Sequence, residues 1–589
     1  MKDKGKLTRR DFLEGAAKYA AITAVSSILP VSAVNCTRQG SDTSYDVIIT
    51  GGTVYDGTDS KPRIMDIGII GDRIVVLGDL AGRRSLKMIN AKGSIVTPGF
   101  IDVHTHCDVV FKNIFGDIDD WDKDKEPEIP PLPPDLMGND NYLFQGVTTV
   151  IGGNCGYGYT HMNRFFRQLH AMTFGTNMGY LTPHGEIRQA LFGDSQPGDL
   201  DDRQLALIKT RIAEEMENGA FGFSTGLEYA PGCFAKTPEL TEIAKVVQSY
   251  GGLYVTHIRN LTGEKEENGD IKVLKALDEA IRIGKTANIP VHLSHLQVNL
   301  PWNDVTGPRI LGPIYNARNE GLDITGDIHA YDVGLSALNY RLPTEFKTQT
   351  GIDDFYKLPE NQHLVKEEIE KVFTYLGPDK IRVWYKEKPM VDPMLMSLID
   401  LLELDRYKGK TASDCYLDLV CGCYLDEVCG DPDRTPTAGM PNAYFYEISG
   451  DVKRHIIAQD HIFMASDGIT SSKYVPLLYT TTHPRSYDNV TRVIKDFVLN
   501  DHLMDIQTAI RKMTSLPAEK FKIKERGKIA EGWFADIAVI DLNRVASHAT
   551  FEEPCQYSDG IKHLIVNGVV TIEDSQTTGQ RAGRPLRRT

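Results

Sequence analysis

The chain has 589 residues, 41% of them hydrophobic and 25% charged, and its formal net charge at pH 7 is -15. This length suits a large domain joined to a second unit. The acidic balance, without a basic stripe or patch, argues against nucleic acid as a partner.

Residues 1–40 resemble an export signal and linker. Arg9 and Arg10 precede an apolar run over residues 16–34, which Lys18 and Tyr19 interrupt. The twin arginine predicts twin-arginine export to the periplasm, and the interruption argues against a transmembrane span. The small residues at 31–33 suit cleavage, and a lipid anchor on Cys36 is the alternative.

Residues 41–98 and 523–589 share a pattern of short strands and tight turns. Asn567 and Gly568 form a strong hairpin signal. The predicted strands cover residues 45–49, 66–70, 74–77, 536–540, 562–566 and 569–572. Two β-rich ends that flank a different middle predict one small β-sandwich built from both termini.

Residues 99–522 alternate strand-like runs with helix-like runs such as 205–218 and 273–285. The predicted strands cover residues 100–106, 148–155, 178–184, 220–225, 254–259, 291–297, 323–331 and 462–467. Eight strands alternating with helices predict an α/β fold, a (β/α)8 TIM-like barrel whose chemistry lies at the carboxyl ends of the strands. A small helical subdomain is predicted in the insertion at about 332–450.

Candidate metal ligands gather at these strand ends. His104 and His106 are two residues apart, and side chains with that spacing on a strand face the same side. Four more candidates end other predicted strands: Cys155, His257, His295 and Asp467. Histidine, cysteine and aspartate are ligands of the zinc type, so the convergent set predicts a metal site.

These motifs together resemble the amidohydrolase superfamily, and within it the D-aminoacylase (N-acyl-D-amino-acid deacylase) branch. The resemblance extends from about residue 45 to the end of the chain. It rests on residues 98–106, 146–150, 153–156, 222–227, 256–259, 294–295, 466–468, 483–485 and 527–536.

The resemblance implies a role for each candidate ligand. Cys155, His257 and His295 match the family residues that hold a tightly bound Zn2+. His104, His106 and Asp467 match those around a second, weaker metal position, and Asp467 also matches the catalytic acid/base.

Substrate recognition departs from the family pattern. In the family an Arg, a Tyr, a Ser and a Lys bind the carboxylate of the amino-acid product; Arg485, Tyr331 and Ser336 match the first three. Gln297 stands in place of the Lys, and His329 stands where the family usually has another Tyr. The lost positive charge leaves D-residue-containing peptides as competing substrates.

The implied function is zinc-dependent removal of the acyl group from small N-acyl-D-amino acids. Alternatives are a dipeptidase acting on peptides with a C-terminal D-residue, a cyclic-amide amidohydrolase, and a non-catalytic binding protein. The cyclic-amide enzymes place a carbamylated Lys on strand four, whereas residues 219–224 contain none. A non-catalytic protein would lack ligands, yet all six positions are filled. The oligomeric state is not predicted.

Four further features carry predictions. The acidic, proline-rich loop at 117–134 is expected either to cover the site or to be a solvated extension. Asp108 is expected either to support a ligand histidine or to be solvated. His184 is expected near the site, and His292 against the helices. The nine cysteines, including Cys415, Cys421, Cys423 and Cys429, favour buried thiols over disulfides.

Overall fold

The computed structural model describes residues 44–115, 132–193, 198–302, 305–347, 358, 360–385, 394–420, 442–474 and 482–589. The predicted export signal, most of the acidic loop at 117–134, and Cys421, Cys423 and Cys429 lie outside these residues, and what was predicted of them stays a prediction.

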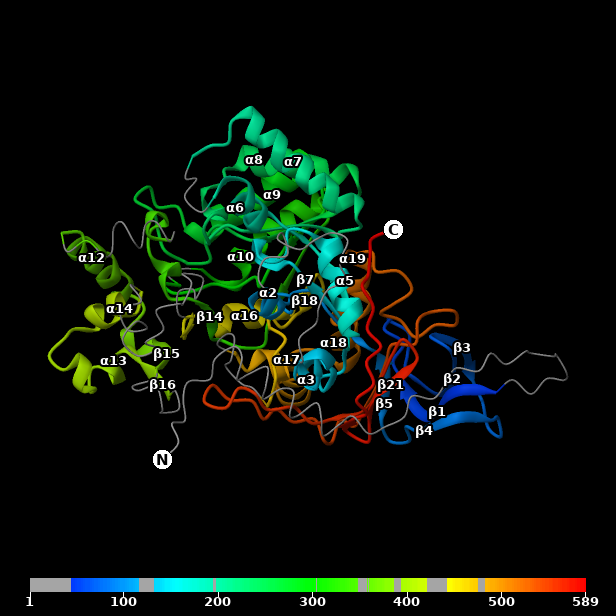
Figure 1. The fold of residues 1–589 in the computed structure, drawn as a ribbon. Helices are drawn as coiled ribbons and strands as arrows, with labels where there is room; N and C mark the ends of the chain where they lie inside the picture. Colours follow the sequence, from blue (N-terminus) through cyan, green and yellow to red (C-terminus); the bar gives the residue numbers. More distant parts are fainter. Residues whose placement is uncertain are drawn as a thin grey trace.

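Eight parallel strands, the third of them in two pieces, form the predicted barrel (Figure 1). They are β6 (Phe100–Asp102), β7 (Val147–Gly152), β8 (Asn177–Tyr180) with β9 (Thr182–Pro183), β10 (Gly222–Gly226), β11 (Leu253–His257), β12 (Val291–Leu293), β13 (Ile324–Ile328) and β18 (Ile462–Met464). The ring closes beyond β6 and β18, where Thr105 pairs with Gly468 and the His106 amide donates to the Gly468 carbonyl at 2.7 Å. The prediction of a (β/α)8 barrel is confirmed.

Helices cover the outside of this ring. They include α2 (Val109–Phe115), α3 (Pro134–Gly138), α4 (Asp140–Leu143), α5 (Met162–Met172), α6 (His184–Phe192), α7 (Asp202–Glu217), α8 (Thr237–Ser249), α9 (Lys272–Ala287), α10 (Gly307–Asn319), α16 (Gly450–Ile457), α17 (Arg485–Arg492), α18 (Ile506–Lys512) and α19 (Ser515–Lys520). Helix α7 begins where Asp201 and Gln204 form a reciprocal capping box, and it buries Ile208, Ile212 and Met216, four residues apart, on one face. Among the residues described, no helix is both long and apolar enough to cross a bilayer.

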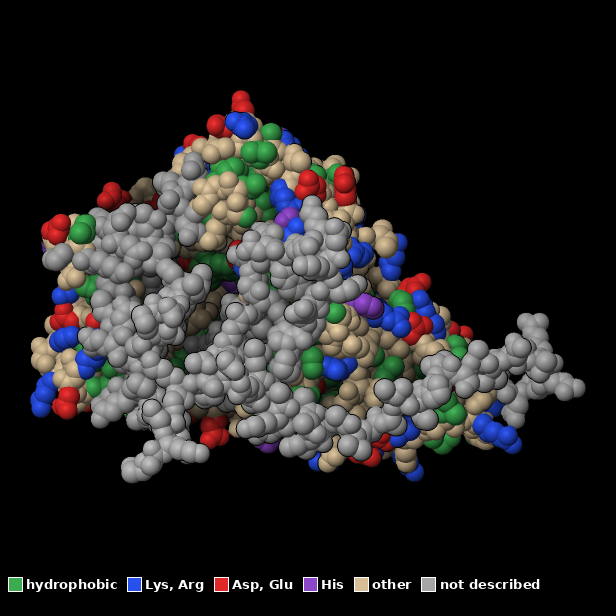
Figure 2. Space-filling view, viewed as in Figure 1, with side chains coloured by type: hydrophobic (Ala, Val, Ile, Leu, Met, Phe, Trp, Pro, Cys, Tyr) green, Lys and Arg blue, Asp and Glu red, His purple; other side chains and the backbone are tan. Residues whose placement is uncertain are grey.

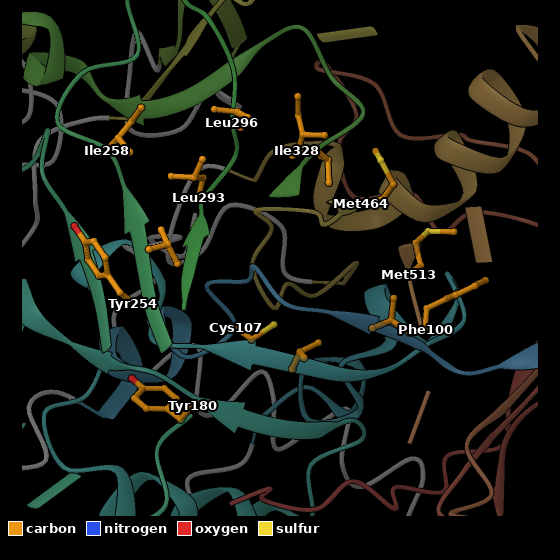
Figure 3. Packing of buried hydrophobic residues seen from close by; sticks show 14 of the residues in the cluster. Phe100, Cys107, Tyr180, Tyr254, Ile258, Leu293, Leu296, Ile328, Met464 and Met513 are labelled. Carbon is orange, nitrogen blue, oxygen red and sulfur yellow. The ribbon is translucent and has the colours of Figure 1, made fainter. Parts of the chain in front are cut away.

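Alternation along the strands separates two cores. On β11, Leu253 and Val255 belong to the cluster inside the barrel, while Tyr254 belongs to the larger cluster between strands and helices. Figure 3 shows side chains of the larger cluster on successive strands, from Tyr254 and Leu293 to Met464. The carboxyl ends of the strands are thereby held in one fixed ring.

Strands from both chain ends form a separate nine-stranded sheet, drawn in blue and red in Figure 1. They are β1 (Tyr45–Val54), β2 (Arg63–Ile70), β3 (Arg73–Gly78), β4 (Ser85–Asn90), β5 (Ile95–Pro98), β19 (Ile537–Ile540), β20 (Ile561–Val566), β21 (Val569–Glu573) and β22 (Gln576–Thr577). Ile74 of β3 and Ile565 of β20 share one core although their strands lie far apart in the sheet order, so the sheet folds over on itself. This is the β-rich unit predicted from both termini.

The insertion between β13 and β18 differs from the small helical subdomain that was predicted. It does contain α12 (Gln362–Phe373), α13 (Leu398–Leu401) and α14 (Ala412–Val420). These accompany a four-stranded antiparallel sheet of β14 (Gly334–Ala337), β17 (Asn442–Phe445), β15 (Ile381–Tyr385) and β16 (Met394–Ser397). The pairing of β14 with β17 spans more than a hundred residues of sequence, which no local pattern indicates.

Charged side chains of both signs are interspersed over the visible part of the face in Figure 2. That distribution agrees with the absence of a basic stripe from the sequence.

A buried ion pair joins the barrel to the β-rich unit. Arg526 and Asp536 are 2% and 4% exposed, and Asp536 also accepts from the Asn567 backbone amide at 2.7 Å and from the Asn177 side chain at 3.2 Å. Asn177 lies on β8, so one carboxylate connects the two units.

We predict that Asp536→Asn destabilises the protein by about 3–5 kcal/mol, because it leaves the Arg526 charge buried without its partner. Urea unfolding measures the effect. The control is Glu573→Gln, which removes a pair with Lys87 that is more than a third exposed on both sides and costs about 0.2–1 kcal/mol. Equal losses in the two variants would contradict the structural role of the junction.

Candidate metal centre and active site

The six predicted ligands converge at the carboxyl ends of the barrel strands. Five of the six side chains form two overlapping groups in which the ligand atoms lie within 4.8 Å of one another. One group is His104, Cys155 and His295; the other is His104, His106 and Asp467. His257 ends β11 beside them, and its ring centroid lies 4.4 Å from that of His295.

Three of these residues adopt a backbone conformation that favours glycine. The φ angles are 52° at Cys155, 30° at His295 and 52° at Asp467. Such conformations cost about 1–3 kcal/mol each, less for aspartate, and are retained where the surrounding structure enforces them. The strain redirects the side chain at the point where each strand ends.

Asn154 fixes the turn that carries Cys155. This turn is the 3-10 helix η2 (Asn154–Gly156), which follows β7. The Asn154 side-chain amide donates to the carbonyl oxygens of Ile151 at 2.9 Å and Val103 at 3.2 Å. It therefore holds the end of β7 against the segment that leads to His104.

Asp327 on β13 contacts three histidines near the candidate metal site. Its carboxylate lies 3.0 Å from His104 Nδ1 and 2.9 Å from His292 Nε2, and it accepts the His295 backbone N–H at 2.8 Å. The bond at His104 Nδ1 leaves Nε2 directed toward Cys155 Sγ, 3.3 Å away. The sequence analysis missed Asp327, because no spacing links it to its partners.

His257 differs from the other ligands in what holds it. Its Nε2 lies 2.9 Å from Glu228 Oε2, and its Nδ1 is buried without a hydrogen-bond partner among the described residues. A buried nitrogen without a partner, beside a thiol and a second imidazole, fits a metal ligand. Sequence analysis did not identify Glu228 either.

Asp467 connects the metal ligands to the predicted substrate arginine. Its Oδ1 lies 3.1 Å from His106 Nε2 and 3.4 Å from His104 Nε2, and its Oδ2 lies 2.8 Å from Arg485 Nη2. Burial alone would raise the pKa of Asp467, but the charges of Arg485 and His104 hold it well below its usual range. The carboxylate is therefore ionised and able to accept a proton.

Without a metal ion, the imidazoles of His106 and His257 retain protons and the Cys155 thiol is ionised. Burial alone would lower the pKa of His106, but Asp467 and Cys155 raise it to about 9. Burial acts the same way on His257, and interactions with Cys155 and Glu228 raise its pKa to about 9. Burial opposes ionisation of Cys155, but the His104 charge keeps the pKa of the thiol well below its usual value.

A pocket of about 340 Å³, counting space open to solvent, lies beside the ligands. Three predicted substrate residues line it: Gln297, Ser336 and Arg485. The structure does not bring Tyr331 to this lining; its hydroxyl donates to Asp488, and Arg492 covers its ring. Residues that sequence analysis missed also line the pocket: Glu228, Tyr229, Tyr340 and Glu447.

The structure also gives the partners of three nearby residues for which predictions were made. His292 does not pack against the helices, because its ring stacks on Phe463 inside the barrel and bonds Asp327. His184 pairs with Glu239 at 2.9 Å and is absent from the pocket lining. Asp108 is buried and accepts from the Tyr180 hydroxyl at 2.8 Å.

The cysteines that the structure describes are free thiols, as predicted, and they include Cys415 on α14.

We predict that the affinity for a divalent metal strengthens as the pH rises from 7 to 9. His106 and His257, with pKa values raised to about 9, are cationic at pH 7, and a metal binds only the neutral rings. Each proton released adds about tenfold in affinity per pH unit below the pKa. Competition with a chelator at several pH values measures the dependence, and calorimetry in buffers of different ionisation enthalpy counts the protons. An affinity that is flat above pH 7 would contradict the proton assignments.

Known proteins resemble this chain over nearly its whole length. Residues 424–572 match the family described as "Amidohydrolase family". The D-aminoacylase of Alcaligenes xylosoxydans xylosoxydans is 28% identical over 574 residues, which are 94% of this chain and 99% of that protein. The N-acyl-D-glutamate deacylase of the same organism is 29% identical over 568 residues, covering 92% of this chain and 96% of that protein.

Solved structures give the same result. The N-acyl-D-glutamate deacylase of Bordetella bronchiseptica, complexed with zinc and a phosphonate that mimics the tetrahedral intermediate, has a TM-score of 0.71 at 26% identity, covering 92% of this chain and 100% of that chain. A Thermus sp. D-hydantoinase, 15% identical with a TM-score of 0.53, shares the fold. The chain is therefore similar over nearly its whole length to the D-aminoacylase branch of the amidohydrolase superfamily, and this similarity indicates a metal-dependent hydrolase.

Proposed function

We propose that the chain uses zinc to hydrolyse the amide bond of N-acyl-D-amino acids. The observation that carries this proposal is the juxtaposition of a Cys–His–Asp ligand cluster with Arg485, both facing one pocket. The cluster provides ligands for a metal, and the guanidinium can bind the carboxylate of an amino acid. The relatives named as D-aminoacylase and N-acyl-D-glutamate deacylase support the same substrate class.

The donor set fits zinc. Cys155, His257 and His295 would hold the tightly bound ion, and His104, His106 and Asp467 would surround a second, weaker position. The fit rests on the unpartnered His257 Nδ1, on the lowered pKa of the Cys155 thiol, and on the closeness of the ligand atoms. When bound, zinc would polarise the amide carbonyl and lower the pKa of water.

Asp467 supplies the proton transfers. Its ionised carboxylate would take a proton from the attacking water and then give it to the leaving nitrogen. Its backbone amide donates to the His104 carbonyl at 2.9 Å, so the carboxylate is fixed relative to the first strand. That arrangement places the proton acceptor beside the metal ligands.

Arg485 couples substrate binding to this step. In the structure its guanidinium pairs with Asp467 and also lies 3.3 Å from His329 Nε2. A substrate carboxylate would compete for the guanidinium and weaken its hold on Asp467. Because the charge of Arg485 lowers the pKa of Asp467, the substrate would thereby make Asp467 a stronger base.

One observation favours a second candidate, hydrolysis of peptides with a C-terminal D-residue. Gln297 replaces the expected Lys, and its amide donates to Asn299 at 3.1 Å. Its Oε1 is buried without a partner among the described residues. An unpartnered acceptor at the pocket suits the N–H groups of a peptide better than a second contact to a carboxylate.

The experiment is zinc-loaded hydrolysis of matched N-acyl-D-amino acids, their L-enantiomers and L,D-dipeptides. We expect turnover of D-substrates only, and Arg485→Gln is expected to lower kcat/KM about 100-fold, because it removes the partner of the substrate carboxylate. The control is Arg492→Gln on the same helix, whose guanidinium lies over Tyr331. Turnover of L-substrates alone, or equal losses in both variants, would contradict the proposal.

The Gln297→Lys substitution tests the departure from the family. We predict a rise of at least about tenfold in kcat/KM for N-acetyl-D-amino acids relative to the wild type, since a charge-assisted hydrogen bond to the substrate carboxylate contributes about 1.5–3 kcal/mol. Gln297→Met, which removes both polar atoms and adds no charge, is the comparison. If the two variants have the same kcat/KM for N-acetyl-D-amino acids, residue 297 does not face the substrate carboxylate.

A further inference from the structure

Glu228 lies at a point where the substrate pocket and the metal ligands meet. It follows β10, is only 4% exposed, and lines the pocket. Its Oε2 lies 2.9 Å from His257 Nε2, and its Oε1 accepts the backbone N–H of Leu261 at 3.4 Å. The side chain is therefore held from two sides, with His257 as one of its anchors.

This contact determines which nitrogen of His257 is available. A neutral imidazole carries one N–H, and an ionised carboxylate can only accept. Glu228 therefore takes the N–H at Nε2 and leaves the lone pair at Nδ1, the atom that is buried without a partner among the described residues. Without the carboxylate, the proton is free to move to Nδ1 and block it.

We propose that Glu228 is a positioning residue of the metal centre, which fixes the tautomer and the orientation of His257 so that Nδ1 binds the metal. The proposal rests on the zinc-dependent function proposed above. Glu228 acts through His257 and has no role in proton transfer.

The same arrangement recurs at His104. There Asp327 bonds Nδ1, and Nε2 is the nitrogen that faces Cys155. Two candidate ligand histidines thus each contact a carboxylate, one within β13 and one just after β10, and the opposite nitrogen faces the site in each case. Carboxylates that hold ligand histidines in this way typically contribute 10–100-fold to metal affinity.

The insertion supports Glu228. Lys347 Nζ donates to the Glu228 backbone carbonyl at 2.9 Å. Burial opposes ionisation of the Glu228 side chain, but the hydrogen bond and charge of His257, followed by the charges of Arg341 and Lys347, lower its pKa. Both residues belong to the insertion between β13 and β18. The pocket carboxylate Glu447 gives a contrast, because its partners are Tyr340 and Arg341.

The test compares zinc affinity in Glu228→Gln and Glu447→Gln, using the purified full chain, a competing chelator and no substrate. Both substitutions neutralise a buried carboxylate of the same pocket, but only Glu228 bonds a ligand histidine. We expect about 10–100-fold weaker zinc binding in Glu228→Gln and a change within about twofold in Glu447→Gln. Glu228→Asp, which keeps the carboxylate, should recover part of the affinity.

Equal zinc affinity in wild type and Glu228→Gln would overturn the proposal, and a raised KM in that variant would then assign Glu228 to substrate binding. If Glu228→Gln does not fold, Glu228→Asp and Glu447→Gln provide the same comparison, with thermal unfolding of the zinc-free proteins as the check on structure. A wild-type chain that binds zinc but hydrolyses no N-acyl-D-amino acid fails the proposed function and leaves this inference intact. A wild-type chain that binds no zinc overturns both.

Discussion

The carboxylate of Asp327 is the constraint on which the rest of the site depends. It contacts His104, His292 and the backbone of His295, so one buried group joins the first, sixth and seventh strands of the barrel. Ionising a buried carboxylate is costly unless charges or hydrogen bonds satisfy it. Here the His104 charge and the two imidazole contacts overcome the effect of burial and lower the pKa of Asp327. The His104 ring is thereby held with Nε2 toward Cys155, and the metal cluster follows from that orientation.

The remaining strand ends are arranged to serve this cluster. Left-handed backbone at Cys155 and Asp467 turns each side chain toward the histidines. The barrel holds these conformations in place, because its strands are packed on both their inner and outer faces. The insertion contributes further contacts, because Ser336 lines the pocket and Lys347 donates to the backbone carbonyl of Glu228. The candidate metal site and the substrate pocket are therefore built jointly. The barrel provides the ligands and Glu228, and the insertion provides Ser336 and Lys347.

The sequence predicted the parts of this arrangement that depend on local patterns. Strand periodicity located the barrel, turn signals located the β-rich unit, and His, Cys and Asp at strand ends indicated the candidate ligands. Asp327 and Glu228 were missed because a carboxylate that holds a histidine comes from another strand, at no fixed spacing. The antiparallel sheet of the insertion was missed for the same reason, since β14 and β17 pair across a long segment. Tyr331 matched a substrate residue by position, but its hydroxyl bonds Asp488 instead.

The central claim is that a thiolate and imidazoles from separate strand ends bind one metal ion. Zinc K-edge X-ray absorption on the full chain, loaded with one equivalent of zinc, tests it most directly. The account predicts one sulfur at about 2.3 Å with nitrogen or oxygen ligands at about 2.0–2.1 Å, and the loss of that sulfur in Cys155→Ser. A spectrum without sulfur in the wild type, or a sulfur that persists in Cys155→Ser, would contradict the ligand set.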